Sequence, residues 1–439
     1  MKSGKQLARE IFRNTLAALD IPRVMEMKLT LEGDVLRLET SAVVLPKDTP
    51  LFVVAIGKAS HALAGGLRSF LPDSYKFKGV VTAPTKPTAP IPGLKYFVGG
   101  HPNPNEESWQ AAEAVLALMR ETHERSVVFF LLSGGGSALA ELPLIPGMRL
   151  EDLQAVNHVL VTCGAPIEEM NAVRRHLSAI KGGRLALAAA SATKVTLAVT
   201  DVPEGKENAL ASGPTVPDPS TITDTNRILN EYGLRKKFPE VVVRWLDTGK
   251  MPETPEPGDP AFRNAYFQLL LGMHDLFHAA HHAAEAYGYA TCCDNSTDDW
   301  PVSRAADTLL QKLEEWRREN PGQRVALIAD GEVSSPVTGD GVGGRNSAFV
   351  LSCVEKIAGR KITVLSAGTD GMDGNSPAAG AVADGETLAR AKALGLDPTT
   401  SLQKSDAHNF FARLDDAILI GPTGNNLRDL RILLANPDP

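Results

Sequence analysis

The chain has 439 residues, more than a single hydrophobic core usually supports, so two domains are expected. Hydrophobic residues make up 43% and charged residues 22% of the sequence, as is typical of a globular protein in water. The formal net charge of −7, and the lack of any Lys- and Arg-rich run, argue against a nucleic-acid partner.

The cysteines and the amino-terminal segment bear on location. The four cysteines have neither the spacing of zinc ligands nor the density of a disulfide scaffold, which predicts a reducing cytoplasm. The first 20 residues show an amphipathic helical pattern with scattered charges, unlike a signal peptide. No apolar run is long enough to span a bilayer. We expect a cytoplasmic protein with no membrane partner.

Short apolar runs alternate with helical patterns along the chain, which predicts an α/β protein with mainly parallel sheets. Gly182-Gly183 is expected to interrupt the last of the early helices. In the first half we expect strands at 51–56, 79–82, 127–132 and 195–200, and helices at 109–120, 150–162 and 167–190.

A proline-rich segment, Asp247–Pro260, carries four prolines and little that could be buried. Such a segment continues neither a helix nor a central strand, so the domain linker is expected here. This gives an N-terminal domain of residues 1–247 and a C-terminal domain of residues 261–439. In the second half we expect strands at 267–271, 289–293, 325–329, 362–366 and 417–420, and helices ending at 286 and spanning 302–318.

Two loops between residues 325 and 380 are rich in polar and charged residues. Each follows an apolar run that reads as a buried strand, and each is rich in Gly, Asp, Ser and Thr, with Arg345 between the two runs. The carboxyl ends of strands are where α/β proteins place phosphate and metal chemistry, so an active site is expected here. Acidic loops of this kind suit Mg²⁺ held between protein and phosphate oxygens. The carboxylates are Asp330, Glu332, Asp340, Asp370 and Asp373.

A second glycine-rich loop consists of Ser133, Gly134, Gly135, Gly136 and Ser137, and it directly follows an apolar run. Successive glycines let a ligand reach the backbone, and the serines add hydroxyl donors. The spacing fits neither the Walker loop nor the G-x-G-x-x-G dinucleotide fingerprint. It predicts an anion-binding loop, with a tight strand-to-helix turn as the alternative.

Lys58 lies at the start of an expected helix, where a cation is unfavourable unless an anion shares the position. It is therefore a candidate for function, with a solvated surface lysine as the alternative. Asp201 ends another apolar run, a position that suits a general base, a magnesium ligand or a helix cap. Arg175 and Lys181 belong to a basic cluster that could hold a carboxylate or phosphate, or form a solvated helix face. His101, in a Gly- and Pro-rich loop, reads as a structural histidine.

Taken together, the motifs resemble the glycerate 2-kinase family of bacteria and animals, whose C-terminal part is called the MOFRL domain. They occur in one order from about residue 51 to the end of the chain, and SGGGSAL with ASGPTVPDPS and AGTDGMDG is a specific combination. Two departures occur: the family usually has Gly-Gly-Glu where this chain has Asp330-Gly331-Glu332, and Gln-Glu where it has Ser347-Ala348. The matching segments are IGKASHAL, GGHPNPNE, LLSGGGSAL, VRRHLSAIKGGRLA, TDVPEG, ASGPTVPDPST, GVGGRN, SAGTDGMDG and GPTGNNLRDL.

The resemblance implies ATP-dependent phosphorylation of D-glycerate at its 2-hydroxyl, giving 2-phosphoglycerate with the help of Mg²⁺. It also implies two α/β domains around an interdomain cleft, the larger one Rossmann-like. The partners are then D-glycerate and ATP, and a homodimer is left open. On this hypothesis the Ser133–Ser137 loop, with Arg175 and Lys181, binds phosphate or the substrate carboxylate.

The same hypothesis assigns the catalytic groups. Lys58 and Arg345 neutralise charge on the transferring phosphoryl group. Asp201 orients or deprotonates the attacking hydroxyl or binds Mg²⁺, and Asp370 is the second metal candidate. The main alternative is an NAD(P)H-dependent hydroxypyruvate reductase, a label also given to proteins of this family, although the dinucleotide fingerprint is missing. A non-catalytic sugar-acid sensor is disfavoured, because no DNA-binding or signalling module is attached.

Overall fold

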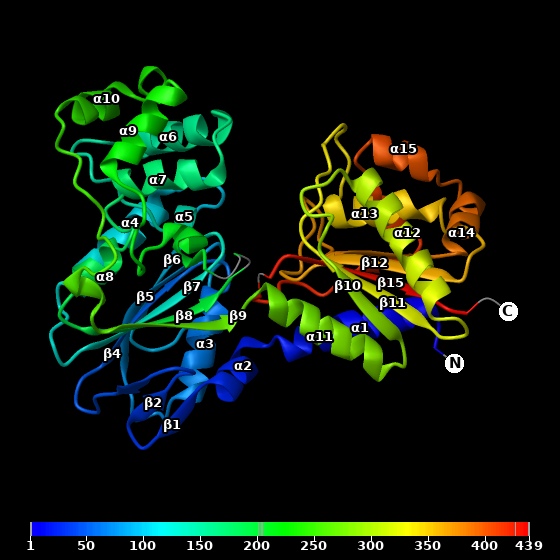
Figure 1. The fold of residues 1–439 in the computed structure, drawn as a ribbon, viewed down its shortest axis with the longest axis horizontal. Helices are drawn as coiled ribbons and strands as arrows, with labels where there is room; N and C mark the ends of the chain where they lie inside the picture. The colour runs from blue at the N-terminus through cyan, green and yellow to red at the C-terminus, as the bar shows by residue number, and fades with distance from the viewer. Residues whose placement is uncertain (1, 201, 203–204, 426, 438–439) are drawn as a thin grey trace. The chain divides into compact units, whose positions relative to one another are not determined.

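The computed structural model describes residues 2–200, 202, 205–425 and 427–437 (Figure 1). The chain divides into two compact units, a larger one formed by Ile21–Leu271 and a smaller one formed by Met1–Asp20 and Gly272–Pro439. Each unit contains its own six-stranded sheet. The predicted α/β class is confirmed.

The larger unit is built on a parallel sheet with the strand order β6-β5-β4-β7-β8-β9. Strands β4 and β7 are buried at every position, as expected of parallel strands that helices cover on both faces. The strands are β4 (Leu51–Ile56), β5 (Phe77–Ala83), β6 (Leu94–Val98), β7 (Val127–Ser133), β8 (Thr193–Val199) and β9 (Ala265–Leu271).

The strand order reverses between β4 and β7. From β4 the chain moves outward to β5 and β6, and it then returns to form β7 on the other side of β4. The loops after β4 and β7 therefore leave neighbouring strands in opposite directions. In open α/β sheets, ligands bind at such a switch point, outside the carboxyl ends of the strands.

Helices cover both faces of this sheet, and a further group of helices forms a second core. Helix α3 lies on β4, β5 and β7, with α2 against it, while α4 and α8 belong to the core on the other face. Helices α6, α7, α9 and α10 share a separate apolar cluster and gather at one end of the unit in Figure 1. The helices are α2 (Ile21–Lys28), α3 (Ser60–Phe70), α4 (Glu106–Met119), α5 (Gly136–Leu139), α6 (Leu150–Thr162), α7 (Ile167–Leu177), α8 (Arg184–Ala188), α9 (Ile222–Glu231) and α10 (Glu240–Asp247).

Shorter elements complete the larger unit. Strands β1, β2 and β3 form a small antiparallel sheet of their own. The predicted break at Gly182-Gly183 is confirmed, because both residues have positive φ between α7 and α8. The bounds are β1 (Thr30–Glu32), β2 (Val35–Arg37) and β3 (Ala42–Val44), with 3-10 turns η1 (Glu207–Ser212), η2 (Leu234–Lys236) and η3 (Pro260–Phe262).

The smaller unit has the strand order β10-β11-β15-β12-β13-β14. Helices α12 and α13 pack on one face of this sheet, and α1 and α11 pack together on the other. Its strands are β10 (Ala290–Asp294), β11 (Val325–Asp330), β12 (Ile362–Gly368), β13 (Gly380–Asp384), β14 (Ala417–Ile418) and β15 (Asp429–Ala435); its helices are α1 (Gly4–Ala18), α11 (Met273–Ala286), α12 (Val302–Glu319), α13 (Arg345–Val354), α14 (Thr387–Ala393), α15 (Pro398–Gln403) and α16 (Ala407–Ala412).

The prediction of mainly parallel strands does not hold for this second sheet. Only β10 and β11 pair in parallel, whereas β15 runs antiparallel to both β11 and β12, and β13 runs antiparallel to β12 and β14. The reason is the path of the chain. The loop before β15 lies at the carboxyl ends of β11 and β12, so the last strand must run back between them.

The two compact units also differ from the predicted domain boundaries, 1–247 and 261–439. The segment Asp247–Pro260 does not separate the units, because β9 follows it and pairs with β8 at the edge of the larger sheet. The first helix, α1, belongs to the smaller unit, where Ala8, Ile11 and Phe12 are buried against β12, β13 and β15. The chain thus passes from one unit to the other twice, at Asp20–Ile21 and at Leu271–Gly272.

Within the described residues, none of the helices is both long and apolar enough to cross a membrane.

Candidate active site

The loops after β4 and β7 are joined at the switch point of the larger sheet. The Lys58 amide donates a hydrogen bond to the Gly134 carbonyl at 2.9 Å, and the Ala59 amide donates to Ser133 Oγ at 2.9 Å. The structure therefore brings Lys58 together with the predicted Ser133–Ser137 loop. These residues are 74 positions or more apart in the sequence, so strand order alone makes them neighbours.

Lys58 and His101 flank the middle glycine of the loop. A Cβ added to Gly135 would lie 3.3 Å from Lys58 Cγ and 3.1 Å from His101 Cδ2. Burial lowers the pKa of His101, and the charge of Lys58 lowers it further, so the imidazole is neutral at pH 7. Reasoning from sequence had treated His101 as structural. The signal that could have found it is its motif, GGHPNPNE, which is one of the segments that carry the resemblance to the family.

Two buried residues fix the far end of the glycine loop. Ser137 Oγ lies 2.8 Å from Ser212 Oγ. Lys181 Nζ donates to the Ser137 carbonyl at 2.8 Å and forms an ion pair with the Glu141 carboxylate. Lys181 is only 3% exposed, and burial lowers its pKa. Its ammonium therefore binds the backbone of the loop and a buried carboxylate, rather than facing open solvent.

The chain around Ser212 is held in an unusual conformation beside the loop. Ala211, Ser212 and Gly213 all have positive φ, at 49°, 60° and 62°. A left-handed non-glycine residue costs about 1–3 kcal/mol, and such strain is concentrated at functional sites. A Cβ added to Gly136 would lie 2.7 Å from Ala211 Cβ, so this strained turn contacts the glycine loop directly. The turn is therefore part of the same site.

Arg175 lies deeper in the larger unit and has its own partners. Its Nε lies 2.8 Å from Asp218 Oδ1, and its Nη2 donates to Ser220 Oγ at 3.1 Å. Both side chains of the ion pair are almost completely buried. The neighbouring His176 is buried as well and bonds through Nδ1 to the Ala172 carbonyl at 2.9 Å. The predicted basic cluster is thus an internal one rather than a solvated helix face.

Asp201 lies outside the described residues, but the strand before it is well defined. In the register of β7 and β8, Ser133 is paired with Val199. The Thr200 amide donates to the Leu271 carbonyl at 3.0 Å. The segment leading to Asp201 therefore leaves the sheet at the same edge as the glycine loop.

In the smaller unit, Arg345 is held between two carboxylates. Its Nε donates to Asp429 Oδ2 at 2.5 Å and its Nη1 donates to Glu332 Oε2 at 2.7 Å. Burial lowers the pKa of Arg345, but the Asp429 and Glu332 carboxylates outweigh burial and raise it. The guanidinium is thus permanently charged and fixed in direction, while 37% of its side chain remains exposed.

Asp370, the second metal candidate, is partly exposed in the loop after β12. Its Oδ1 accepts a hydrogen bond from the Met372 amide at 3.0 Å. Across the described ranges, no group of three or more His, Cys, Asp or Glu side chains is placed to hold a metal ion.

Asp330, one of the departures from the family pattern, is completely buried at the end of β11. Among the residues that the structure describes, neither carboxylate oxygen has a hydrogen-bond partner, and Arg428 Nη1 lies 3.9 Å from Oδ2. Burial raises the pKa of Asp330 to about 6, although Arg428 and Arg431 oppose the shift. Because an ordinary aspartate ionises near pH 3.8, the folded protein keeps its proton to higher pH than the unfolded chain does.

Asp330→Asn should therefore change how stability depends on pH. The stability that Asp330 contributes is present below pH 4 and is lost as pH rises through 6, whereas an asparagine cannot ionise. Between pH 4.5 and 7.5, the free energy of unfolding of the variant should rise by on the order of 1–3 kcal/mol relative to that of wild type. Thermal unfolding midpoints measured at the two pH values would show this change. The fully exposed Asp73, changed to Asn, serves as the control. An identical pH profile for all three proteins would contradict the expectation.

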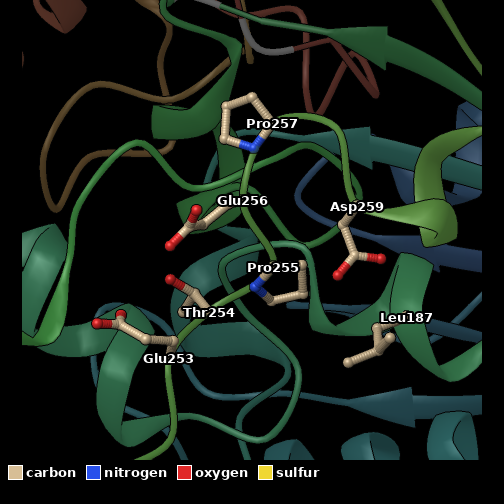
Figure 2. Close-up of a pocket in the computed structure, with 7 residues that line it drawn as sticks. All are labelled: Leu187, Glu253, Thr254, Pro255, Glu256, Pro257 and Asp259. Atoms are coloured by element: carbon tan, nitrogen blue, oxygen red, sulfur yellow. The ribbon is translucent and has the colours of Figure 1, made fainter.

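A separate hollow in the larger unit is not lined by the glycine loop. It measures ≈ 420 Å³ and is lined mainly by the proline-rich segment that had been expected to link the domains. Figure 2 shows three carboxylates around it, those of Glu253, Glu256 and Asp259. A hollow with this lining repels a phosphate or a small carboxylic acid, so we do not assign it to the reaction. Thr254 is buried, which shows that the segment packs onto the unit.

Comparisons with known proteins agree with the motifs. The profile of DUF4147, described as a domain of unknown function, matches residues 7–247, and that of the MOFRL family matches residues 325–429. A D-glycerate 2-kinase of Thermotoga maritima is 34% identical over 98% of each chain. A glycerate 2-kinase of Pyrococcus horikoshii is 32% identical over 88% of this chain and 87% of that one.

Two further similarities complete the comparison. The crystal structure of glycerate kinase from Thermotoga maritima has a TM-score of 0.83 and 33% identity, and it covers 98% of this chain and 99% of that one. A protein of Agrobacterium vitis with the provisional name hydroxypyruvate reductase is 35% identical over 87% of this chain and 86% of its own. The chain belongs to the glycerate kinase family, with a DUF4147 region followed by a MOFRL region.

Proposed function

We propose that the protein is an ATP-dependent glycerate 2-kinase that converts D-glycerate and ATP into 2-phosphoglycerate and ADP. The observation that carries the proposal is the joint between the loops after β4 and β7, which sets Lys58 beside three glycines at a switch point. The names of the kinase relatives support the substrate. The reaction takes place in the cytoplasm, where the four cysteines, all free, stay reduced.

In the larger unit, the proposal gives each group one task. The glycine loop donates backbone N–H groups to phosphate or to the substrate carboxylate. Lys58 neutralises the charge that spreads over the phosphoryl oxygens, while the imidazole of His101 is neutral beside it and leaves Lys58 as the cation. Asp201 orients the 2-hydroxyl or accepts its proton as the new O–P bond forms and the bond to ADP breaks.

In the smaller unit, Arg345 is assigned to charge neutralisation, because two carboxylates fix its direction and much of it remains exposed. Asp370 is assigned as a carboxylate ligand of Mg²⁺, which takes one or two carboxylates together with phosphate oxygens, and a role of Asp201 as metal ligand is the alternative to its role at the hydroxyl. The partial exposure of Asp370 fits a ligand shared with a nucleotide. When bound, the ion would supply further neutralisation of phosphate charge.

The proposal predicts transfer of the γ-phosphoryl group from ATP to D-glycerate, with one ADP formed for each 2-phosphoglycerate. ADP formation, followed with a coupled assay, should require both D-glycerate and Mg²⁺ and should not occur with L-glycerate at a comparable rate. The same preparation should not oxidise NADH or NADPH in the presence of hydroxypyruvate. Oxidation of the nicotinamide without ADP formation would replace the kinase with the reductase.

A further inference from the structure

The N-cap residue of the helix that begins at Arg345 supplies no side-chain cap to the amides of the first turn. This residue is Gly344, which carries no side chain, so the first amides of α13 need a partner from elsewhere. That partner is the Asp373 carboxylate, which comes from the loop after β12. Oδ1 accepts from the Asn346 amide at 2.9 Å, and Oδ2 accepts from the Ser347 amide at 2.9 Å and from Ser347 Oγ at 2.6 Å.

Two loops interlock to make this cap. A Cβ added to Gly344 would lie 2.3 Å from Asp373 Oδ1 and 2.5 Å from the Gly374 amide nitrogen, so only a glycine permits the approach. On the other side, Asn375 Oδ1 accepts from the Gly343 amide at 2.8 Å. Side chains of the loop after β12 therefore accept hydrogen bonds both from the loop before α13 and from the first turn of that helix.

The Asp373 carboxylate is better placed to cap the helix than to bind a substrate. It is only 2% exposed, and all three of its recorded donors lie at the first turn of α13. Burial raises its pKa, although the hydroxyl and the amide of Ser347 and the amide of Asn346 oppose the shift. A carboxylate at a helix amino terminus also interacts favourably with the helix dipole.

We propose that Asp373 is a positioning residue: by capping α13 from a distant loop, it fixes the first helical residue, Arg345, in the orientation in which it contacts Asp429 and Glu332. The proposal concerns structure, and its kinetic part rests on the proposed kinase activity. Ser347 is part of the same cap, since its hydroxyl donates to the Asp373 carboxylate.

The first test needs no substrate. Asp373→Asn places an amide N–H₂ group against a set of donors, and hydrogen–deuterium exchange of the peptide over residues 344–350 should become at least about 10-fold faster. The control is Asp397→Asn, which removes the aspartate that caps α15 by accepting from the Thr400 amide at 2.7 Å. That control should leave exchange at 344–350 unchanged. Unchanged exchange in Asp373→Asn would overturn the proposal.

The second test is a double-mutant cycle with Arg345→Lys. Asp373→Asn alone should lower kcat by about 10-fold with KM within about 2-fold, because a misplaced group costs rate more than binding. In the Arg345→Lys background, Asp373→Asn should lower kcat by less than about 2-fold, because the guanidinium that Asp373 positions is already absent. An equal loss in both backgrounds would reduce Asp373 to a structural residue and contradict the proposal.

Two outcomes keep these tests separate from the proposed function. If the wild-type protein shows no kinase activity, the proposed function fails, and the exchange experiment still decides the cap. If Asp373→Asn does not fold, Ser347→Ala replaces it, because it adds no group and removes the hydroxyl that donates to Asp373 and accepts from the Gly344 amide. Ser347→Ala should then accelerate exchange at 344–350 to a smaller degree, and unchanged exchange would count against the cap.

Discussion

Lys58→Ala should lower kcat by about 10³-fold or more while leaving the thermal unfolding midpoint within a few degrees of wild type. The amide of Lys58 makes the bond to Gly134, and the substitution keeps that amide, so the joint between the two loops survives. What is lost is the ammonium of a side chain whose Cγ packs beside Gly135. A cation at this point is worth most when charge develops on the phosphoryl group, so the loss falls on kcat.

Two companion variants make the Lys58 experiment decisive. Lys58→Arg keeps the positive charge but replaces the compact ammonium with a planar guanidinium, so this variant should retain only part of the wild-type activity. Lys86→Ala removes an exposed lysine from the loop after β5 and should leave kcat unchanged. A folded Lys58→Ala protein with nearly wild-type kcat would show that Lys58 is a surface residue and that the site lies elsewhere.

Gly57→Ala should destabilise the larger unit by about 3–5 kcal/mol and remove activity. Gly57 has φ of +137°, which side chains rarely adopt, and an added Cβ would lie 2.2 Å from Ser133 Oγ and 2.6 Å from the Ser133 carbonyl oxygen. The clash would push apart the two loops that the Ala59–Ser133 hydrogen bond joins. Chemical denaturation and the kinase assay would measure both effects.

The matched control for Gly57 is Gly65, which lies within α3, a few residues along the same segment. Nothing lies within 4 Å of a Cβ added to Gly65. Alanine is favoured over glycine inside a helix by about 1 kcal/mol, so Gly65→Ala should be neutral or slightly stabilising. Equal effects of the two substitutions would show that the loss comes from replacing any glycine near α3, not from separating the loops.

The sequence predicted the larger sheet well because its strands are simple. β4 and β7 are buried on both faces, and such strands read as continuous apolar runs that end in glycine-rich turns. β15 was missed because its apolar run is interrupted by a charged residue. It contains Arg431, which is completely buried and donates to the Asp330 and Gly331 carbonyls. A buried arginine inside a strand is rare, and it hides the strand in the sequence.

The domain boundaries could not be predicted because the deciding contacts are distant in sequence. The amphipathic pattern of α1 shows that one face is buried, but it does not show which core covers that face. The structure packs it on β12, β13 and β15, more than 300 positions later. In the same way, Asp247–Pro260 has the composition of a linker, yet Thr254 is buried in the larger unit.

For the candidate site, the sequence predicted which strand-end loops meet better than it predicted which charges are paired. Strand-end loops could be located from apolar runs, and the structure brings Lys58 and the glycine loop together. The ion-pair partners of the basic cluster could not be predicted from the sequence. Lys181 and Arg175 looked like ligands for an anion, but Glu141 and Asp218, about 40 positions away, already neutralise them. Such pairing depends on how α7 and the following turn pack, which no local pattern shows.

The most direct test of the account is the identity of the phosphorylated product. The purified protein would be incubated with ATP, Mg²⁺ and D-glycerate, and phosphorus and proton NMR would follow the reaction. The account predicts that 2-phosphoglycerate accumulates in step with ADP, and that neither appears with Lys58→Ala. Formation of 3-phosphoglycerate, or no phosphoester at all under conditions where the protein oxidises NADH or NADPH with hydroxypyruvate, would contradict it.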